Sequence, residues 1–348
     1  KLWYRGYDIH TLAKGAAFPE VLYLLWYGDL PNRAELIAFE GLLAAERELP
    51  SEVMEVLRGL PSDTVPMSAL RTAVSALGCV DPDSESNDRG ADLAKGVRLV
   101  SQMPTVVAAF HRLREGKAPI SPDPDLSHSA NFLYMLNGDR PGETATRALD
   151  TSLILYLEHG LNASTFACRI VASTLSDMHS AITAGIGALK GPLHGGANQR
   201  AMEMLLEIEE HGDAEAWVDA ALAEGKKIMG FGHRVYRTED PRATHLRRMS
   251  EELSDDAGAA RLHALARTVE STMLDRKSIP CNVDFYCATV YGSLGFPLDL
   301  YTPLFAIGRV GGWVGHVMEQ HENNRLIRPR AEYVGELDRR FVRLEERR

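Results

Sequence analysis

Apolar residues recur at intervals of three and four along most of this 348-residue chain, which is the period of an amphipathic α-helix. Runs that alternate apolar and polar residues, as half-buried strands do, are scarce. The pattern predicts helices over 68–78, 144–165, 214–225, 257–275 and 301–320. The last of these is apolar on most sides, which is typical of a buried helix. Loops rich in Pro, Asp and Ser are predicted over 81–90 and 114–129. We therefore expect an all-α fold.

The composition excludes several classes of protein. The length favours two domains, or one large and one small. A net charge of −10 disfavours nucleic acid as a partner. The longest apolar stretches, such as 21–27, are far shorter than the roughly 20 residues that span a membrane. The four cysteines form no CxxC pair and the histidines lack zinc-site spacing, so we expect no metal and a reducing cytoplasm. The chain begins at Lys1 without methionine, so we also expect a native segment before it.

The stretch GPLHGGANQ, residues 191–199, surrounds His194 with three glycines and a proline just before a helix-like run. His194 is therefore predicted to precede a helix N-terminus, where free N–H groups and the helix dipole disfavour an imidazolium. A neutral histidine can donate a hydrogen bond to a carbonyl oxygen in enolisation chemistry. The alternative is a glycine-rich turn in which the histidine is incidental.

A second stretch, GFGHRVYRTEDPRA, places His233 beside glycine and follows it with Arg234, Arg237 and Arg242. Arginine clusters favour carboxylates or phosphates because the guanidinium group pairs with them through two hydrogen bonds. The alternative is a solvated basic loop.

A third stretch, residues 279–297, places Asp284 among apolar neighbours. Desolvation raises the pKa of such an aspartate and suits it to act as a general base, although a helix cap or a hydrogen-bonded core residue is the alternative. His159 lies at a His-Gly pair that breaks a helix, and Arg328 lies in a further basic cluster. Arg309 interrupts an apolar helix, and a buried arginine needs an anionic partner.

Together these stretches resemble the citrate synthase family. The segments that match, in the family's order, are GPLHGGAN, GFGHRVYRTEDPR, NVDFY and GRVGGWVGHVMEQ…NRLIRPRAEYVG. Further similar segments are YRGYDIHTLA, PMSALRTAVSAL, LSHSANFLYML and EHGLNAST, so the resemblance covers essentially the whole chain. It implies a short, bacterial-type homodimer with a large helical domain, 1–195 and 298–348, and a small helical domain, 196–297. The active site is expected in the cleft between the two domains.

The resemblance also implies roles for individual residues. His194 and Asp284 correspond to the pair that enolises the acyl group, and His233 to the histidine that polarises the oxaloacetate ketone. Residues expected to bind oxaloacetate are His159, Arg242, Arg309 and Arg328, the last of which reaches into the partner subunit's site. Residues expected near coenzyme A are Arg237, Lys227, Met229 and Gly230.

The implied reaction condenses oxaloacetate with acetyl-CoA to citrate and CoA, through an enol and the hydrolysis of citryl-CoA, and requires no metal or redox cofactor. One alternative is a 2-methylcitrate synthase that uses propionyl-CoA. Another is a catalytically silent acyl-CoA-binding sensor, against which the intact His194, His233 and Asp284 argue. The chain departs from the family at Val65, where many relatives carry histidine, and at Cys287, where serine is common. We expect Cys287 to alter the acyl pocket if its side chain faces inward.

Overall fold

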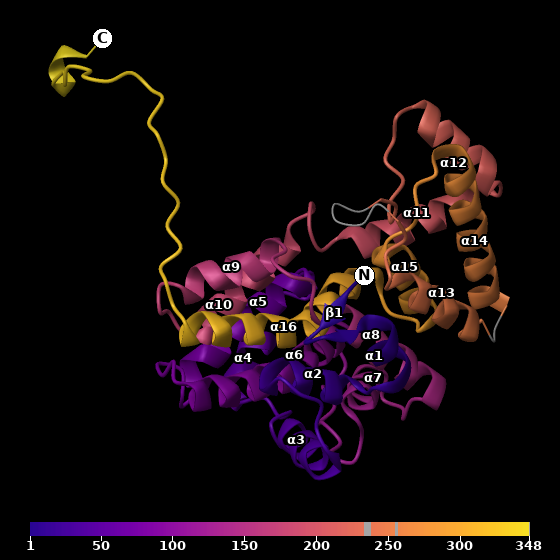
Figure 1. The fold of residues 1–348 in the computed structure, drawn as a ribbon, viewed down its shortest axis with the longest axis horizontal. Coiled ribbons are helices and arrows are strands. Elements are labelled where there is room, and N and C mark those ends of the chain that lie inside the picture. Colours follow the sequence, from indigo (N-terminus) through magenta and orange to yellow (C-terminus); the bar gives the residue numbers. More distant parts are fainter. Residues whose placement is uncertain (233–237, 255–256, 348) are drawn as a thin grey trace.

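The computed structural model of the chain describes residues 1–232, 238–254 and 257–347, which are mostly helical (Figure 1). The N-terminal helices are α1 (Ile9–Gly15), α2 (Phe18–Tyr27), α3 (Arg33–Ala45), α4 (Ser51–Arg58), α5 (Pro66–Val80), α6 (Arg89–Arg114) and α7 (His128–Asn137). They are followed by α8 (Glu143–Leu157), α9 (Ala163–Ala172) and α10 (Met178–Lys190). Strand within the described residues is confined to β1 (Trp3–Tyr4) and β2 (Tyr7–Asp8), which pair antiparallel. The predicted all-α fold is confirmed.

The remaining helices are α11 (Ala197–His211), α12 (Ala214–Ala223), α13 (Ala243–Glu252), α14 (Ala257–Lys277), α15 (Val283–Ser293) and α16 (Tyr301–Glu322), with short 3₁₀ turns η1 (Leu298–Leu300) and η2 (Leu344–Glu346). The predicted helices at 68–78, 214–225, 257–275 and 301–320 correspond to α5, α12, α14 and α16. The predicted loops at 81–90 and 114–129 correspond to the connections 81–88 and 115–127, because α6 spans Arg89–Arg114 and α7 begins at His128. None of the described helices combines the length and the apolar character that crossing a bilayer requires.

The buried helix α16 forms the centre of the main helix group, by which we mean α1–α10 with α16. Its most extensive contacts are with α6, α8, α9 and α10. Close packing against the end of α8 depends on Gly312, because a Cβ atom there would lie 2.1 Å from the carbonyl oxygen of Leu157. This approach fixes the point at which the chain leaves α8 and enters the candidate site.

The single helix predicted over 144–165 is wrong, whereas the helix break expected at the His159–Gly160 pair is confirmed. Helix α8 ends at Leu157 and α9 begins at Ala163, so residues 158–162 form a loop. Gly160 adopts a φ of 59°, and the side chain of Asn162 caps α9 by accepting a hydrogen bond from the backbone N–H of Thr165. These two local signals outweigh the apolar periodicity, and the break carries His159 to the surface of a pocket.

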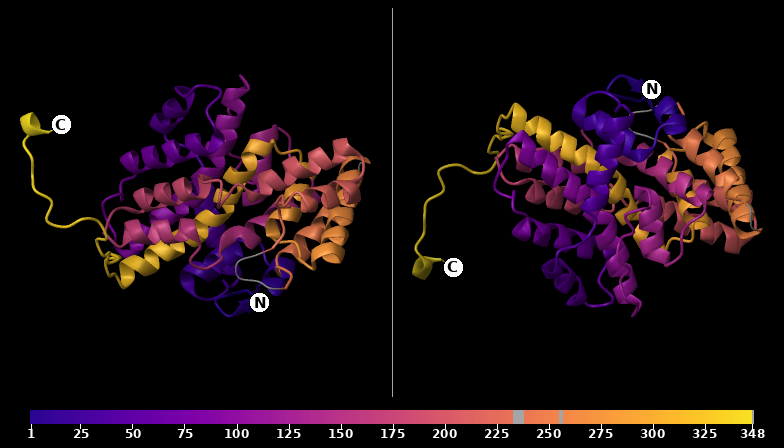
Figure 2. Two further views of the ribbon diagram at one scale, coloured as in Figure 1. Left: turned by 90° about the horizontal axis from the view of Figure 1, so that it is seen from above. Right: turned by 90° about the horizontal axis from the view of Figure 1, so that it is seen from below.

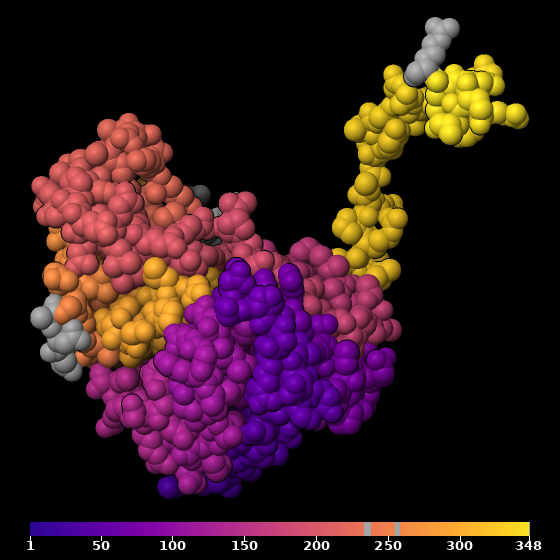
Figure 3. Space-filling view, turned by 180° about the vertical axis from the view of Figure 1, so that it is seen from behind, coloured from indigo at the N-terminus to yellow at the C-terminus, as the bar shows by residue number. Residues whose placement is uncertain are grey.

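Helices α11–α15 pack mainly on one another and form a second helix group, which projects from the main group in every ribbon view (Figures 1 and 2). The second group meets the main group through α8, α16 and η1. The predicted boundaries of the small domain, 196–297, enclose these five helices, and the division into two domains stays a prediction. Beyond α16, residues 323–347 are mostly exposed and extend away from the body of the protein (Figures 1 and 3).

Candidate active site

A pocket of about 940 Å³ is lined by residues of both helix groups. Its walls come from the loop after α8, the loop before α11, the residue that caps α13, the start of α15 and the middle of α16. Gly232 and the first two residues of the chain also line it. The pocket brings together five residues that the sequence singled out: His159, His194, Arg242, Asp284 and Arg309.

Asp284 lies in the first turn of α15, which begins after the cap residue Asn282. The Asn282 side chain accepts a hydrogen bond from the backbone N–H of Asp284, at 3.0 Å. The Tyr156 hydroxyl donates to Oδ1 of Asp284, at 3.1 Å. Burial raises the pKa of Asp284 to about 6, although Arg242 and the Tyr156 hydrogen bond act in the opposite direction. This carboxylate is therefore a stronger base than an ordinary aspartate and is still mostly ionised at pH 7.

His194 precedes α11, as predicted, two residues before the cap residue Gly196. Its Nε2 accepts the backbone N–H of Ser164, at 3.2 Å, and lies 2.8 Å from the Ser164 hydroxyl. A backbone N–H can only donate, so we assign the single ring proton of neutral His194 to Nδ1. Burial lowers the pKa of His194 to about 4, and the charge of Arg309 acts in the same direction. The ring is therefore neutral at pH 7 and can serve as a hydrogen-bond donor through Nδ1.

Two buried guanidinium groups reach the pocket. Arg242 is held by Asp240 through two hydrogen bonds, from Nε at 3.0 Å and from Nη2 at 2.8 Å. Arg309 donates from Nε to the carbonyl oxygen of Tyr156 and lies over the ring of Phe305, 4.9 Å from its centroid. Burial and the neighbouring charge of Arg242 lower the pKa of Arg309. An anionic ligand would relieve both penalties, so this part of the pocket is suited to a carboxylate.

Among the described residues, the remaining candidates, Arg328, Lys227, Met229 and Gly230, do not line this pocket. Arg328 is exposed beyond α16, where its Nη1 donates to the carbonyl of Pro329 at 3.3 Å. Lys227 is exposed and Met229 is half-buried, both in the segment after α12. His233 and Arg237 lie outside the described residues.

Gly230 does not line the pocket but contacts the start of α15, which carries Asp284. Its carbonyl accepts a hydrogen bond from the backbone N–H of Asn282, at 2.8 Å. Gly230 has a φ of 81°, and a Cβ atom there would lie 2.6 Å from Cβ of Phe285. Only glycine fits these two conditions, so this residue fixes the approach of the segment to the start of α15.

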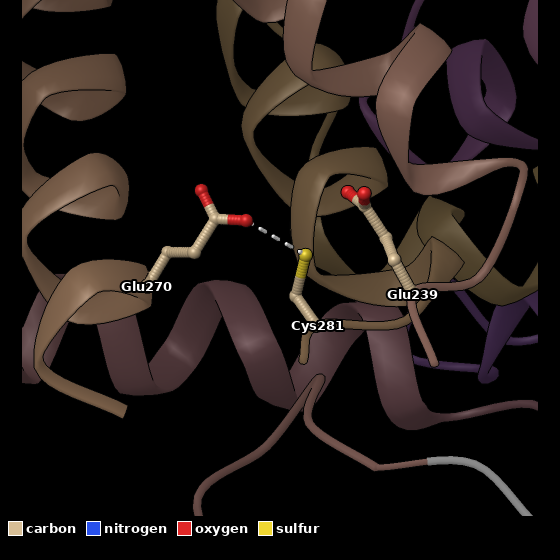
Figure 4. A group of neighbouring side chains, drawn as sticks. All are labelled: Glu239, Glu270 and Cys281. Atoms are coloured by element: carbon tan, nitrogen blue, oxygen red, sulfur yellow. Dashed lines mark hydrogen bonds between the residues drawn. The ribbon is translucent and has the colours of Figure 1, made fainter. Parts of the chain in front are cut away.

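A cluster of Glu239, Glu270 and Cys281 lies beside the loop that leads into α15 (Figure 4). Cys281 donates to Glu270 with an Sγ–Oε1 distance of 3.3 Å. Arg247 pairs with both carboxylates, and Arg267 pairs with Glu270 at 2.7 Å. Because guanidinium groups already compensate the acidic charge, we interpret the cluster as an ion-pair network that supports the loop and not as a metal site.

Comparison with known proteins identifies the family of the chain. A sequence profile of the citrate synthase C-terminal domain matches residues 1–330. The chain is 48% identical to citrate synthase 2 of Bacillus subtilis over 347 residues, which is 99% of this chain and 93% of that protein. The chain belongs to the citrate synthase family.

Two other members of the citrate synthase family bear on the site. A 2-methylcitrate synthase of Shewanella oneidensis is 42% identical over 99% of this chain and 92% of its own length. The solved ternary complex of citrate synthase from Thermoplasma acidophilum with carboxymethyl coenzyme A and oxaloacetate has a TM-score of 0.92. It is 36% identical, and the match covers 98% of this chain and 92% of that chain.

Both departures from the family's common residues lie away from the pocket wall. Val65 is an exposed residue at the N-cap of α5. Cys287 is fully buried on α15 and does not line the pocket; the nitrogen of the Asn198 side chain lies 4.0 Å from its Sγ. Burial raises the pKa of its thiol to about 12, so the thiol stays protonated at neutral pH. Cys287 therefore packs behind Asp284 and does not narrow the pocket directly.

Sequence reasoning missed the residues that hold the functional groups in place. These are Tyr156 beside Asp284 and Arg309, Ser164 beside His194, and Asp240 beside Arg242. Asp240 is two residues from its partner, in the same quoted motif, so an acid next to an arginine was an available signal. Tyr156 and Ser164 are separated from their partners by 128 and 30 residues, and only the fold brings them together.

Proposed function

We propose that this protein condenses oxaloacetate with acetyl-CoA to give citrate and free CoA, a step of the tricarboxylic acid cycle. The observation that carries the proposal is the pairing of a base and a neutral donor in one pocket. Asp284 has a pKa raised to about 6, and His194 has a pKa lowered to about 4. Two titratable groups whose environments move their pKa values in opposite directions are suited to the removal of a weakly acidic proton next to a carbonyl.

The chemistry follows from these two groups. The Asp284 carboxylate removes a proton from the acetyl methyl group, while the Nδ1–H of His194 donates to the thioester oxygen on which negative charge develops. The enol carbon then attacks the ketone carbon of oxaloacetate, and the ketone oxygen gains a proton. Water finally hydrolyses the citryl thioester and releases CoA. These steps require no metal or redox cofactor.

Oxaloacetate carries two carboxylates, and the pocket offers two buried arginines, Arg242 and Arg309, next to His159. The solved relative from Thermoplasma acidophilum, in complex with oxaloacetate and carboxymethyl coenzyme A, supports the same substrates for this chain. By the family motifs, we place His233 at the ketone oxygen. We place coenzyme A along the segment that contains Lys227, Met229 and Gly230, with Arg237 near its phosphates.

We also propose a homodimer in which Arg328 completes the partner subunit's site. The exposed position of Arg328, on the segment that leaves the body of the protein, supports this arrangement. Helix α9 presents Phe166 and Ile170, one turn apart and 42% and 38% exposed. Apolar side chains gathered on one face are suited to a subunit interface.

We propose that the chain has a large domain, 1–195 and 298–348, and a small domain, 196–297. A movement of the small domain toward the large one would then bring the site residues together. We propose that oxaloacetate binds first and closes the small domain, because His159 and His194 belong to the large domain and Arg242 and Asp284 to the small one. Closure would exclude water from the enolisation step. Scattering with and without oxaloacetate tests this, and an unchanged particle shape would contradict it.

We place the protein in the cytoplasm. Its four cysteines are free thiols, three of them buried, as a reducing compartment allows.

The deciding experiment measures the release of thiol from acetyl-CoA in the presence of oxaloacetate, and then repeats it with propionyl-CoA. We expect oxaloacetate-dependent release and a preference for acetyl-CoA of about 10- to 200-fold in kcat/KM, the range that one methylene provides. The relatives named 2-methylcitrate synthase make the second substrate a necessary comparison. A preference for propionyl-CoA would make this chain a 2-methylcitrate synthase. The absence of release with either substrate would favour an acyl-CoA-binding sensor.

A further inference from the structure

Tyr156 makes two contacts that belong to different halves of the proposed reaction. Its hydroxyl donates to Oδ1 of Asp284 at 3.1 Å, and its backbone carbonyl accepts a hydrogen bond from Nε of Arg309. It is fully buried and does not line the pocket, so it does not touch a substrate there.

The surrounding packing fixes Tyr156 firmly. The residue lies one position before the end of α8, where the last carbonyls of a helix have no partner within the helix, and Arg309 of α16 takes this one. Its ring packs against Phe305 of α16, with centroids 4.3 Å apart. The guanidinium group of Arg309 lies over the ring of the same Phe305. A single residue of α8 therefore links α15, which carries the base, to α16, which carries the arginine.

We propose that Tyr156 is a positioning residue that fixes Asp284 relative to Arg309, so that the proton-abstracting carboxylate and the carboxylate-binding guanidinium keep one geometry. This inference rests on the proposed condensation. The hydroxyl holds the base and the carbonyl holds the arginine, so the two contacts can be separated by mutation. Burial keeps the phenol protonated by raising its pKa well above the ordinary value, and the hydroxyl is therefore always a donor.

Removal of the hydroxyl has a defined direction. A hydrogen bond to the ionised form lowers the pKa of Asp284, so its loss raises that pKa further above about 6. The other charged or titratable groups that face Asp284 among the described residues are Arg242, Asp240, Arg309 and Cys287. Tyr156→Phe keeps these four residues but also removes the hydrogen bond between the Tyr156 hydroxyl and the Cys287 thiol.

The test compares Tyr156→Phe with Tyr291→Phe. Tyr291 is an equally buried tyrosine on α15 whose hydroxyl lies 3.5 Å from the Ser152 hydroxyl. Like the Tyr156 hydroxyl, it is also hydrogen-bonded to the Cys287 thiol, so Tyr291→Phe is the matched control for the loss of that contact. In a plot of kcat against pH, the acid limb is the fall of kcat at low pH as Asp284 becomes protonated. For Tyr156→Phe we expect the pKa of this limb to rise by about one unit. The ratio of wild-type to variant kcat should then rise about fivefold between pH 8 and pH 6. The KM for oxaloacetate should not change, because the carbonyl contact to Arg309 remains.

A merely structural role would lower kcat by the same factor at every pH and would lower thermal stability alike in the two variants. An unmoved acid limb in Tyr156→Phe, or the same movement in Tyr291→Phe, overturns the inference. A difluorotyrosine at position 156 is the second variant, since its more acidic phenol is a stronger donor and should move the limb to lower pH. If wild-type protein releases no CoA with oxaloacetate, the proposed function fails; if it does and the limb stays fixed, only the role of Tyr156 fails.

Discussion

The assignment of the His194 proton to Nδ1 leads to a quantitative prediction. With a pKa of about 4, roughly one ring in a thousand is an imidazolium at pH 7. The Nε2 atom is occupied by the backbone N–H of Ser164, so the only proton that the ring can offer the thioester is on Nδ1. Removal of one such donor at a developing oxyanion typically costs about 10²–10³ in kcat, or about 3–4 kcal/mol of transition-state stabilisation. We expect a loss of this size for His194→Ala.

Two further variants at position 194 distinguish the nitrogen atoms. The amide nitrogen of asparagine lies near the position of Nδ1, whereas the longer glutamine places its amide near Nε2. We therefore expect His194→Asn to retain more activity than His194→Gln. The assay is initial-rate thiol release with saturating oxaloacetate and acetyl-CoA at pH 8, where Asp284 is ionised in all variants. A kcat for His194→Ala within about tenfold of wild type, or a glutamine variant faster than the asparagine variant, would refute the assignment.

Two other predictions concern the dimer and the stability of the fold. Mixed dimers of Arg328→Ala and Asp284→Asn chains should recover about one active site per dimer if Arg328 acts in the partner's site; inactive mixed dimers of folded chains contradict that assignment. Burial and the neighbouring His10 lower the pKa of His245 to about 4, so the unfolded state binds more protons below pH 6.5. The free energy of unfolding should then fall by up to about 3 kcal/mol between pH 6.5 and pH 4. His245→Gln should flatten this slope in urea titrations and the exposed His211→Gln should not; equal slopes would exclude His245 as the cause.

Much of the fold could be predicted because helical periodicity repeats along the chain. The pattern fails between α8 and α9, where residues 153–157 continue the apolar run directly into the loop. The left-handed conformation of Gly160 and the cap at Asn162 decide that boundary, and both are single-residue effects that a periodic pattern averages out. The same break exposes His159 to the pocket.

The site could be predicted in its residues but not in its electrostatics. An isolated aspartate in an apolar stretch was enough to expect a raised pKa for Asp284. For His194 the expected cause was the helix N-terminus, whereas burial is the larger cause and Arg309, 115 residues away along the chain, adds to it. The contacts of Tyr156 depend on how α8, α15 and α16 meet, and such three-helix junctions leave no local signal.

The proposed mechanism depends most on Asp284 as the base, and one substitution tests this directly. Asp284→Asn keeps the shape of the side chain and removes its ability to accept the methyl proton. We expect oxaloacetate-dependent release of CoA to fall at least about 10²-fold in kcat, the lower end for a positioned base, with the thermal transition retained. A folded Asp284→Asn protein with near-wild-type kcat would contradict the account.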